Sequence, residues 1–165
     1  MKFNNLDTQE SPYFLLTRAS LSATAMLRKA LASAGLGNIR PAYLGVLMCL
    51  WKEESLDEAL AKLGTREGMK IAELGRCAGL EPSSMTGVID RMERDGLVER
   101  TSDPDDRRAQ IIRLTAEGSR VRGKVTGAVD AALAECFAGI DMKRLAAFSE
   151  VLRAVLRSTN RGELS

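Results

Sequence analysis

A change of hydrophobic periodicity at Gly96 constrains the fold of this sequence more than any other feature. Before this glycine, apolar residues follow the spacing of one face of a half-buried helix: Met85, Val88, Ile89 and Met92. After it, residues 97–100 and 110–114 read as two short strands around a polar tip. The segment from about 81 to 114 is therefore predicted to form a helix, ended by Gly96, and then a β-hairpin.

A second short amphipathic helix is predicted directly before this unit. Over residues 70–78, Ile71, Leu74 and Cys77 fall on one face, and Gly79 marks the turn to the next helix. The order helix, turn, helix and hairpin defines a winged helix-turn-helix. In this arrangement the second helix is shaped to enter the major groove of B-DNA.

Long helices are predicted on both sides of the winged helix. A helix over 12–34 has Ser11 as its cap, and a mostly buried second helix is expected over 40–51. After the hairpin, residues 115–137 and 142–158 form two more helices with apolar faces. The faces of the first and last helices are too large for this chain to bury alone, which predicts a dimer through them. The predicted fold class is mainly α, with a small β-hairpin wing.

The composition argues against metal sites and enzymatic chemistry. The chain has no histidine, and its cysteines at 49, 77 and 136 include no CxxC pair. Zinc sites and most nucleophilic triads need those groups, so we expect no metal, no cofactor and no enzyme activity. The three scattered cysteines also argue against a disulfide framework, and each is predicted to be a buried structural residue.

Hydropathy and charge constrain the location and the partners. No apolar run approaches the roughly 18 residues that span a bilayer, and the N-terminus lacks signal-peptide features, so we expect a cytoplasmic protein. The net charge is only +2, and residues 70–113 contain eight basic and nine acidic residues. A DNA-binding face must therefore come from where the charges lie rather than from their total.

Small polar residues at the start of the second helix of the pair suit close approach to DNA. The helix N-terminus offers backbone N–H groups to a phosphate, and Arg91 lies one turn further on. At the hairpin tip, arginines suit the narrow minor groove, and neighbouring aspartates can orient them. The predicted DNA-binding residues are Lys70, Ser83, Ser84, Thr86, Gly87, Arg91, Asp106, Arg107 and Arg108.

The same block resembles the MarR family of transcriptional regulators over about residues 70–118. The similar segments are the helix-turn-helix at 71–74 and 83–86, the recognition helix and first wing strand at 88–100, and the wing at 103–109 and 114–118. The best matches for the family's wing aspartate and arginine are Asp106 and Arg108, whereas Arg107 fills a more variable position. The flanking helices agree with the family in order and character rather than in motif.

The resemblance implies a homodimeric regulator, expected to be a repressor, which binds a palindromic operator and is released by a small organic effector. Its expected partners are double-stranded DNA, a second copy of the chain and that effector, with no membrane. The implied organisation is a dimerisation helix at 1–38, a DNA-binding region at 39–114 and dimerisation helices at 115–165. Candidate effector-pocket residues are Tyr13, Arg18, Arg28, Met48 and Trp51.

Three alternatives stay open at this point. The segment at about 52–69 is longer than the usual family connection, and it is either surface elaboration or the border of a ligand pocket. A cysteine-redox-responsive regulator is the second alternative, although the first helix lacks a cysteine. The third is a winged helix that binds protein, which the small polar residues at 83–87 disfavour. Tyr43 and Trp51 are interpreted as core residues rather than as a ligand platform.

Overall fold

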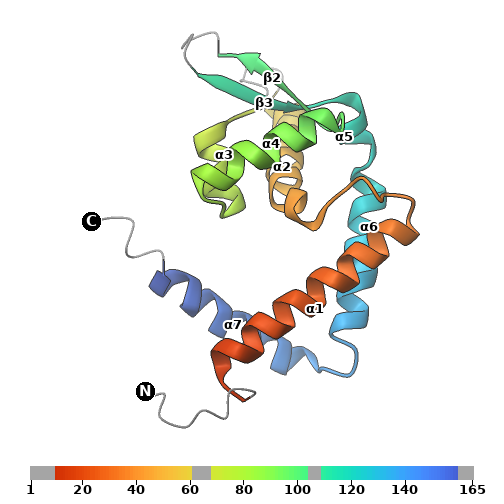
Figure 1. Cartoon of the computed structure of the whole chain (residues 1–165), viewed down its shortest axis with the longest axis vertical. Helices are drawn as coiled ribbons and strands as arrows, with labels where there is room; N and C mark the ends of the chain where they lie inside the picture. Colours follow the sequence, from red (N-terminus) through yellow and green to blue (C-terminus); the bar gives the residue numbers. More distant parts are fainter. Residues whose placement is uncertain (1–9, 61–67, 104–108, 160–165) are drawn as a thin grey trace.

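The computed structural model describes residues 10–60, 68–103 and 109–159, arranged as two lobes. Figure 1 shows one lobe formed by α2 (Leu44–Leu60), α3 (Ile71–Ala78), α4 (Pro82–Arg94), α5 (Ala116–Arg120) and a small sheet. The other lobe contains α1 (Pro12–Ser33), α6 (Arg122–Cys136) and α7 (Met142–Thr159). The predicted fold class is confirmed: the chain is mainly helical with a winged helix-turn-helix.

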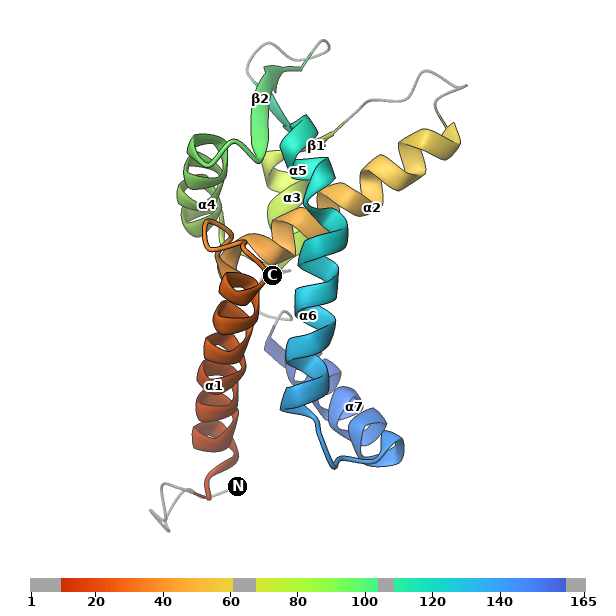
Figure 2. The same cartoon turned by 90° about the vertical axis from the view of Figure 1, so that its right-hand side faces the viewer.

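The first helices follow the sequence pattern with two differences. α1 begins directly after Ser11, whose hydroxyl makes no capping hydrogen bond, and a 3-10 turn, η1 (Pro41–Tyr43), leads into α2. α2 was expected to end near residue 51, but it continues to Leu60. Residues 52–60 contain no glycine or proline and include three glutamates and two leucines, so nothing stops the helix. In Figure 2 this part of α2 extends away from the lobe.

The sheet has three strands instead of the predicted two. Strands β2 (Val98–Ser102) and β3 (Gln110–Leu114) form the expected antiparallel hairpin. A two-residue strand, β1 (Met69–Lys70), pairs with the other edge of β3, which gives the order β1-β3-β2. Two residues are too few to produce a periodic pattern, so the sequence gives no signal for β1.

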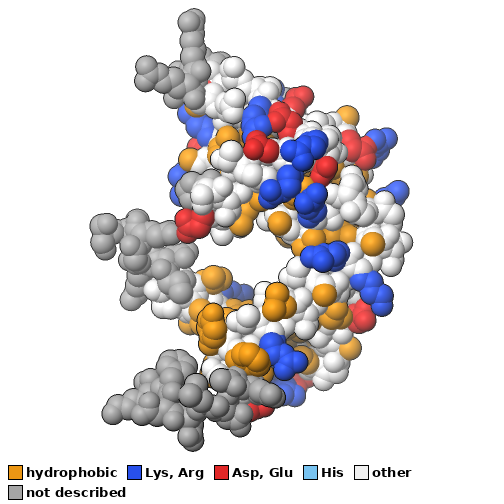
Figure 3. Space-filling model, in the orientation of Figure 1, with side chains coloured by type: hydrophobic (Ala, Val, Ile, Leu, Met, Phe, Trp, Pro, Cys, Tyr) orange, Lys and Arg blue, Asp and Glu red, His pale blue; other side chains and the backbone are white. Residues whose placement is uncertain are grey.

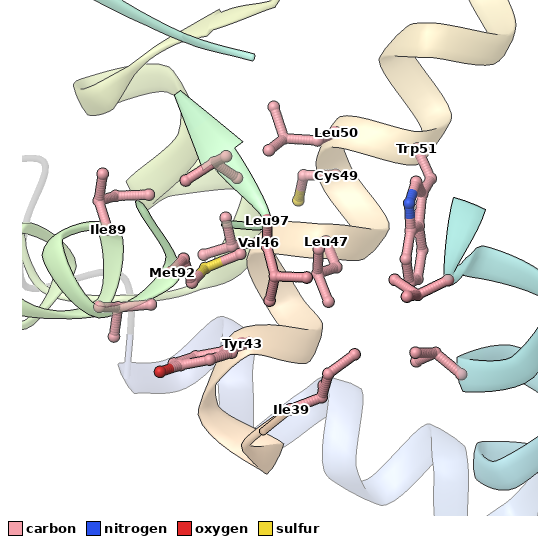
Figure 4. Close-up of a cluster of buried hydrophobic side chains, with 14 of the residues drawn as sticks. Ile39, Tyr43, Val46, Leu47, Cys49, Leu50, Trp51, Ile89, Met92 and Leu97 are labelled. Atoms are coloured by element: carbon pink, nitrogen blue, oxygen red, sulfur yellow. The ribbon is translucent and has the colours of Figure 1, made fainter. Parts of the chain in front are cut away.

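The core of the winged-helix lobe surrounds α2. Figure 4 shows Val46, Leu47 and Leu50 of α2 facing Ile89 and Met92 of α4 and Leu97, which lies between α4 and β2. All four apolar residues of the predicted α4 face are buried: Met85, Val88, Ile89 and Met92. Tyr43 and Trp51 are buried as well, which confirms their interpretation as core residues. The hydrophobic face of α4 therefore fixes the helix on α2 and leaves its polar face outward.

The C-terminal helices define the second lobe. The single helix predicted over 115–137 is split at Val121 into α5 and α6, and the Thr115 hydroxyl caps α5 by accepting from the Gly118 amide at 3.0 Å. α6 packs along α1, with Val125 buried between them and the core. α7 starts after Asp141, whose carboxylate caps the helix by accepting from the Arg144 amide at 2.9 Å.

Large apolar side chains remain exposed on the helical lobe. Figure 3 shows hydrophobic atoms gathered over the lower part of the molecule, where α1 and α7 lie. The exposed large apolar residues of α1 and α7 are Tyr13, Leu15, Leu16, Leu21, Met142, Phe148, Val151, Val155 and Leu156. Among the described residues, no helix is long and apolar enough to cross a membrane.

Cys49 of α2 and Cys77 of α3 form a disulfide, and Cys77 is exposed, so the prediction of three buried structural cysteines without a disulfide is wrong. The two helices approach closely because Gly45 has no side chain: a Cβ there would lie 3.2 Å from the Ala78 carbonyl oxygen. This approach brings the Cα atoms of the two cysteines to 6.2 Å. A tertiary contact across 28 residues leaves no mark on the local pattern. Cys136 is a free, half-buried thiol.

Candidate nucleic-acid interface

The exposed face of α4 carries the predicted DNA-contacting side chains. Ser83, Ser84 and Thr86 are exposed, on the face opposite to the buried apolar residues. The Glu81 carbonyl oxygen accepts from the amides of Ser84 at 3.0 Å and Met85 at 2.9 Å. Since proline at the first helical position has no N–H, the Ser83 amide is the group of this turn that remains for a phosphate within the described chain.

The side chain of Arg91 lies against Gly87 on the same helix. A Cβ added at Gly87 would lie 3.4 Å from Nη1 of Arg91, so the guanidinium lies against the helix one turn before its own Cα. Arg91 is half-exposed in this position. Gly87 therefore leaves room for the guanidinium, whereas the sequence predicted the glycine itself to approach DNA.

The ion pairs among the described residues of this region leave several arginines without a carboxylate partner, although its net charge is not positive. Arg100 of β2 forms ion pairs with both Asp90 and Glu93, which neutralises two carboxylates of α4 and ties the helix to the sheet. Within the part of the chain that the structure describes, three arginines of α3 and α4 pair with no carboxylate: Arg76, Arg91 and Arg94. The helix pair α3 and α4 thus presents arginines without a partner among the described carboxylates, although residues 70–113 carry no positive net charge.

Lys70 lies beneath the wing, at the point where β1 passes into α3. Its Nζ is 2.9 Å from Oδ2 of Asp103, whose side chain has no exposed surface. The Lys70 amide donates to the Glu73 carboxylate at 3.2 Å. The lysine predicted as a DNA contact is therefore already paired with a buried carboxylate.

The wing tip itself falls outside the described residues, and with it the predicted contacts Asp106, Arg107 and Arg108. Its base is well defined. Val98 pairs with Leu114 and Ser102 with Gln110, and the Asp103 amide donates to the Ala109 carbonyl oxygen at 3.1 Å. These contacts close the neck from which the tip extends.

A buried tyrosine holds the end of the recognition helix. The Tyr43 hydroxyl donates to Oδ2 of Asp95, the residue after the last turn of α4, at 2.7 Å. Burial raises the pKa of Tyr43, and the hydrogen bond and negative charge of Asp95 raise it further. The sequence placed Tyr43 in the core but gave no signal for this partner, which is 52 residues away.

The candidate effector-pocket residues do not meet in the described chain. Tyr13 and Arg28 are exposed on α1, and Arg18 lies over the Phe14 ring at 5.9 Å. Met48 is exposed on α2, whereas Trp51 is buried and donates from Nε1 to the Gly118 carbonyl oxygen at 3.0 Å. An apolar hollow of about 540 Å³ lies elsewhere, between α6 and α7, and is lined by Leu133, Phe137, Ile140, Leu145, Phe148 and Leu152.

Known proteins resemble this chain over both lobes. Residues 58–109 match the model of the MarR family. The organic hydroperoxide resistance transcriptional regulator of Bacillus subtilis is 26% identical over 123 residues, which cover 74% of this chain and 73% of that protein.

Two solved structures extend the similarity to the flanking helices. A MarR-family transcriptional regulator from Rhodococcus sp. RHA1 has a TM-score of 0.70 and 28% identity, and covers 92% of this chain and 96% of its own. CouR from Rhodococcus jostii RHA1, solved with p-coumaroyl-CoA, has a TM-score of 0.69 and 26% identity, with coverage of 92% and 95%. The fold agreement therefore includes α1 and α6 as well as the winged helix.

Proposed function

We propose that this chain, which is similar to MarR-family regulators, acts as a homodimeric DNA-binding repressor on a palindromic operator. Regulators of this family bind DNA and are not enzymes. The observation that carries the proposal is the two-sided character of α4, which buries its apolar face on α2 and presents serines, a threonine and Arg91 outward. Such a helix is suited to the major groove.

The exposed apolar faces of α1 and α7 support the homodimer. Tyr13, Leu21 and Leu156 have exposed fractions of 74%, 66% and 61%. Contiguous apolar surface on a soluble protein favours association, and identical chains most often associate as a two-fold dimer. A two-fold dimer presents two copies of α4 to the two half-sites of a palindrome. The half-site centres are then about 10–10.5 base pairs apart, or a multiple of that spacing.

Helix and wing have separate tasks in this proposal. Thr86 and Arg91 contact base edges in the major groove and provide sequence preference. Arg108, oriented by Asp106, enters the minor groove, where phosphate charge and groove width dominate. Replacing Arg108 by alanine should therefore weaken specific and scrambled duplexes evenly and flatten the salt dependence. Unchanged affinity and salt dependence for both duplexes would exclude a wing contact.

A small organic effector, anionic or aromatic, releases the operator in this proposal. The support comes from CouR, which was solved with p-coumaroyl-CoA. We place the effector between the two lobes, and the exposed Arg18 and Arg28 of α1 are the candidate sources of positive charge for an anion. A thermal-shift screen of aromatic acids and their thioesters tests this, and a stabilising compound must also lower DNA affinity.

The Cys49–Cys77 disulfide favours a second candidate, regulation by thiol oxidation. A hydroperoxide would oxidise the two thiols to the disulfide and would itself be reduced to an alcohol and water. The relative from Bacillus subtilis is named for organic hydroperoxide resistance. Release of DNA on peroxide treatment, abolished by Cys49→Ser and Cys77→Ser, would replace the organic effector by this redox mechanism.

The proposed function is tested with promoter DNA from the chain's own gene. Mobility-shift titration should show a preference for one promoter duplex over a scrambled duplex of equal length. Transcription from that promoter should fall when the protein is added to a reconstituted reaction. Equal binding to both duplexes contradicts sequence-specific regulation, and increased transcription contradicts repression while leaving DNA binding intact.

A further inference from the structure

We infer that Lys70 and Asp103 are positioning residues that hold the wing in register with the helix-turn-helix, and that Lys70 does not bind a DNA phosphate. The inference rests on the proposed DNA-binding function, because it assigns to this pair the orientation of the element that contacts DNA.

Asp103 is buried at the base of the wing. This carboxylate directly follows β2, its side chain has no exposed surface, and the Lys70 ammonium lies 2.9 Å away with 34% of its side chain exposed. The Lys70 ammonium stabilises the charged form of this buried carboxylate, so the pair has a structural reason to stay closed. A phosphate that recruited Lys70 would have to displace it from Asp103.

The register of the sheet places Lys70 and Asp103 on the same face. Lys70 of β1 and Thr101 of β2 both pair with Ile111 of β3, so the three side chains share one face. Ile111 is fully buried, so this face of the sheet is covered, whereas the main core cluster contains Ile112 of the opposite face. Asp103 lies two residues after Thr101 and points the same way, so the ion pair spans β3 from one edge strand to the other.

Lys70 and Asp103 belong to two different parts of the DNA-binding unit. Lys70 is the residue directly before α3, and its amide is bound by Glu73 of that helix. Asp103 is the last described residue before the wing tip, and its amide closes the neck on Ala109. The pair therefore joins the start of the helix-turn-helix to the base of the wing. Fixing this base reduces the conformational freedom that the wing would lose on binding DNA.

The two possible roles of Lys70 predict opposite effects of Asp103→Asn on DNA affinity. If Lys70 were a phosphate ligand, the substitution would free it and remove a negative charge, and binding would become tighter. If the pair positions the wing, binding becomes weaker despite the favourable change in charge. Glu99→Gln is the matched control, because Glu99 is an exposed residue of β2, the strand that Asp103 directly follows, and its substitution removes the same charge.

The experiment measures the affinity of the full-length protein for its promoter duplex and for a scrambled duplex. We expect Asp103→Asn and Lys70→Met each to weaken promoter binding by roughly tenfold, and the double variant to be no weaker than either single variant. Lys70→Arg, which retains the cation, should stay near wild type, and Glu99→Gln should bind at least as well as wild type. Equal or tighter binding by Asp103→Asn overturns the inference.

A second readout needs no DNA. In the free protein, hydrogen exchange of the backbone amide of residue 103 should be faster in Asp103→Asn and in Lys70→Met than in wild type. The Ile89 amide of α4 should keep its protection in both variants. Because this readout is independent of operator binding, it separates failure of the inference from failure of the proposed function. Unchanged protection at residue 103 in both variants would show that the pair does not hold the wing.

Discussion

Gly118 fixes the contact between the winged helix and the C-terminal helices through its backbone. Its carbonyl oxygen accepts from the Trp51 indole, and a Cβ at this position would lie only 2.1 Å from the Leu97 carbonyl oxygen. The Thr115 amide bonds to the same Leu97 carbonyl at 3.1 Å. Any side chain at Gly118 must therefore displace backbone between the end of α4 and the start of α5.

Gly118→Ala should lower the free energy of unfolding by about 1–3 kcal/mol, because the added methyl group overpacks the backbone. Gly123→Ala is the matched control. Gly123 lies in α6 with nothing within 4 Å of an added Cβ, so alanine should stabilise the helix by roughly 0.5–1 kcal/mol. Urea unfolding of the two variants should give shifts of opposite sign, and shifts of equal sign and size would contradict the close contact.

Tyr43→Phe should destabilise the protein by about 1 kcal/mol at neutral pH, because Asp95 loses its hydrogen bond. The folded state raises the pKa of Tyr43 above its ordinary value of 10.0. This contribution is therefore complete below pH 10 and is lost as the pH rises through the folded-state pKa. Urea unfolding across this range should show the wild-type advantage shrinking toward high pH, and a constant difference would argue against an ionisation-linked bond.

At the residue scale, periodicity was sufficient to place α4 but not its partners. The buried positions Met85 and Met92 follow from helical spacing alone. The bond of Tyr43 to Asp95 and the ion pair of Lys70 with Asp103 depend on which segments meet in space. Lys70 was consequently predicted as a DNA contact from its charge and place before α3, whereas its paired state required the structure.

At the scale of the elements, strong local signals gave correct boundaries and weak ones did not. Gly96, with φ of +72°, ends α4 as predicted because an L side chain is disfavoured there. The two-residue β1 and the break between α5 and α6 at Val121 were missed, since both depend on packing rather than on a breaker residue. The first half of the 52–69 segment continues α2, and residues 61–67 lie outside the described chain.

The disulfide between α2 and α3 should contribute about 3–4 kcal/mol to stability, because it closes a loop across 28 residues in the unfolded chain. A thiol reductant should therefore lower the melting temperature of the wild type. The variant Cys49→Ser should melt at the lower temperature with or without reductant, whereas Cys136→Ser, at the free thiol, should respond like wild type. A wild-type melting temperature independent of reductant contradicts the crosslink.

At the scale of the whole molecule, the helical lobe should be completed by a second chain. Sedimentation of the wild type at micromolar concentration should show one species near twice 17.9 kDa. Leu21→Glu and Leu156→Glu place charges on the apolar faces of α1 and α7, and each should raise the dimer dissociation constant by roughly tenfold or more. Met48→Glu, on the exposed side of α2, is the control and should remain dimeric. A monomeric wild type contradicts this assembly.

Sequence-specific DNA binding by the exposed face of α4 is the central claim. Its most direct measurement is fluorescence anisotropy of wild type, Thr86→Ala, Arg91→Ala and Lys124→Ala with promoter and scrambled duplexes across a salt series. Lys124 is an exposed cation of α6 in the other lobe and serves as the control.

We predict that wild type and Lys124→Ala prefer the promoter duplex to the same extent. Thr86→Ala and Arg91→Ala should each lose about 1–3 kcal/mol of that preference while keeping most of their affinity for scrambled DNA. A wild-type protein that binds both duplexes equally at every salt concentration, or α4 variants that keep the full preference, would contradict the account.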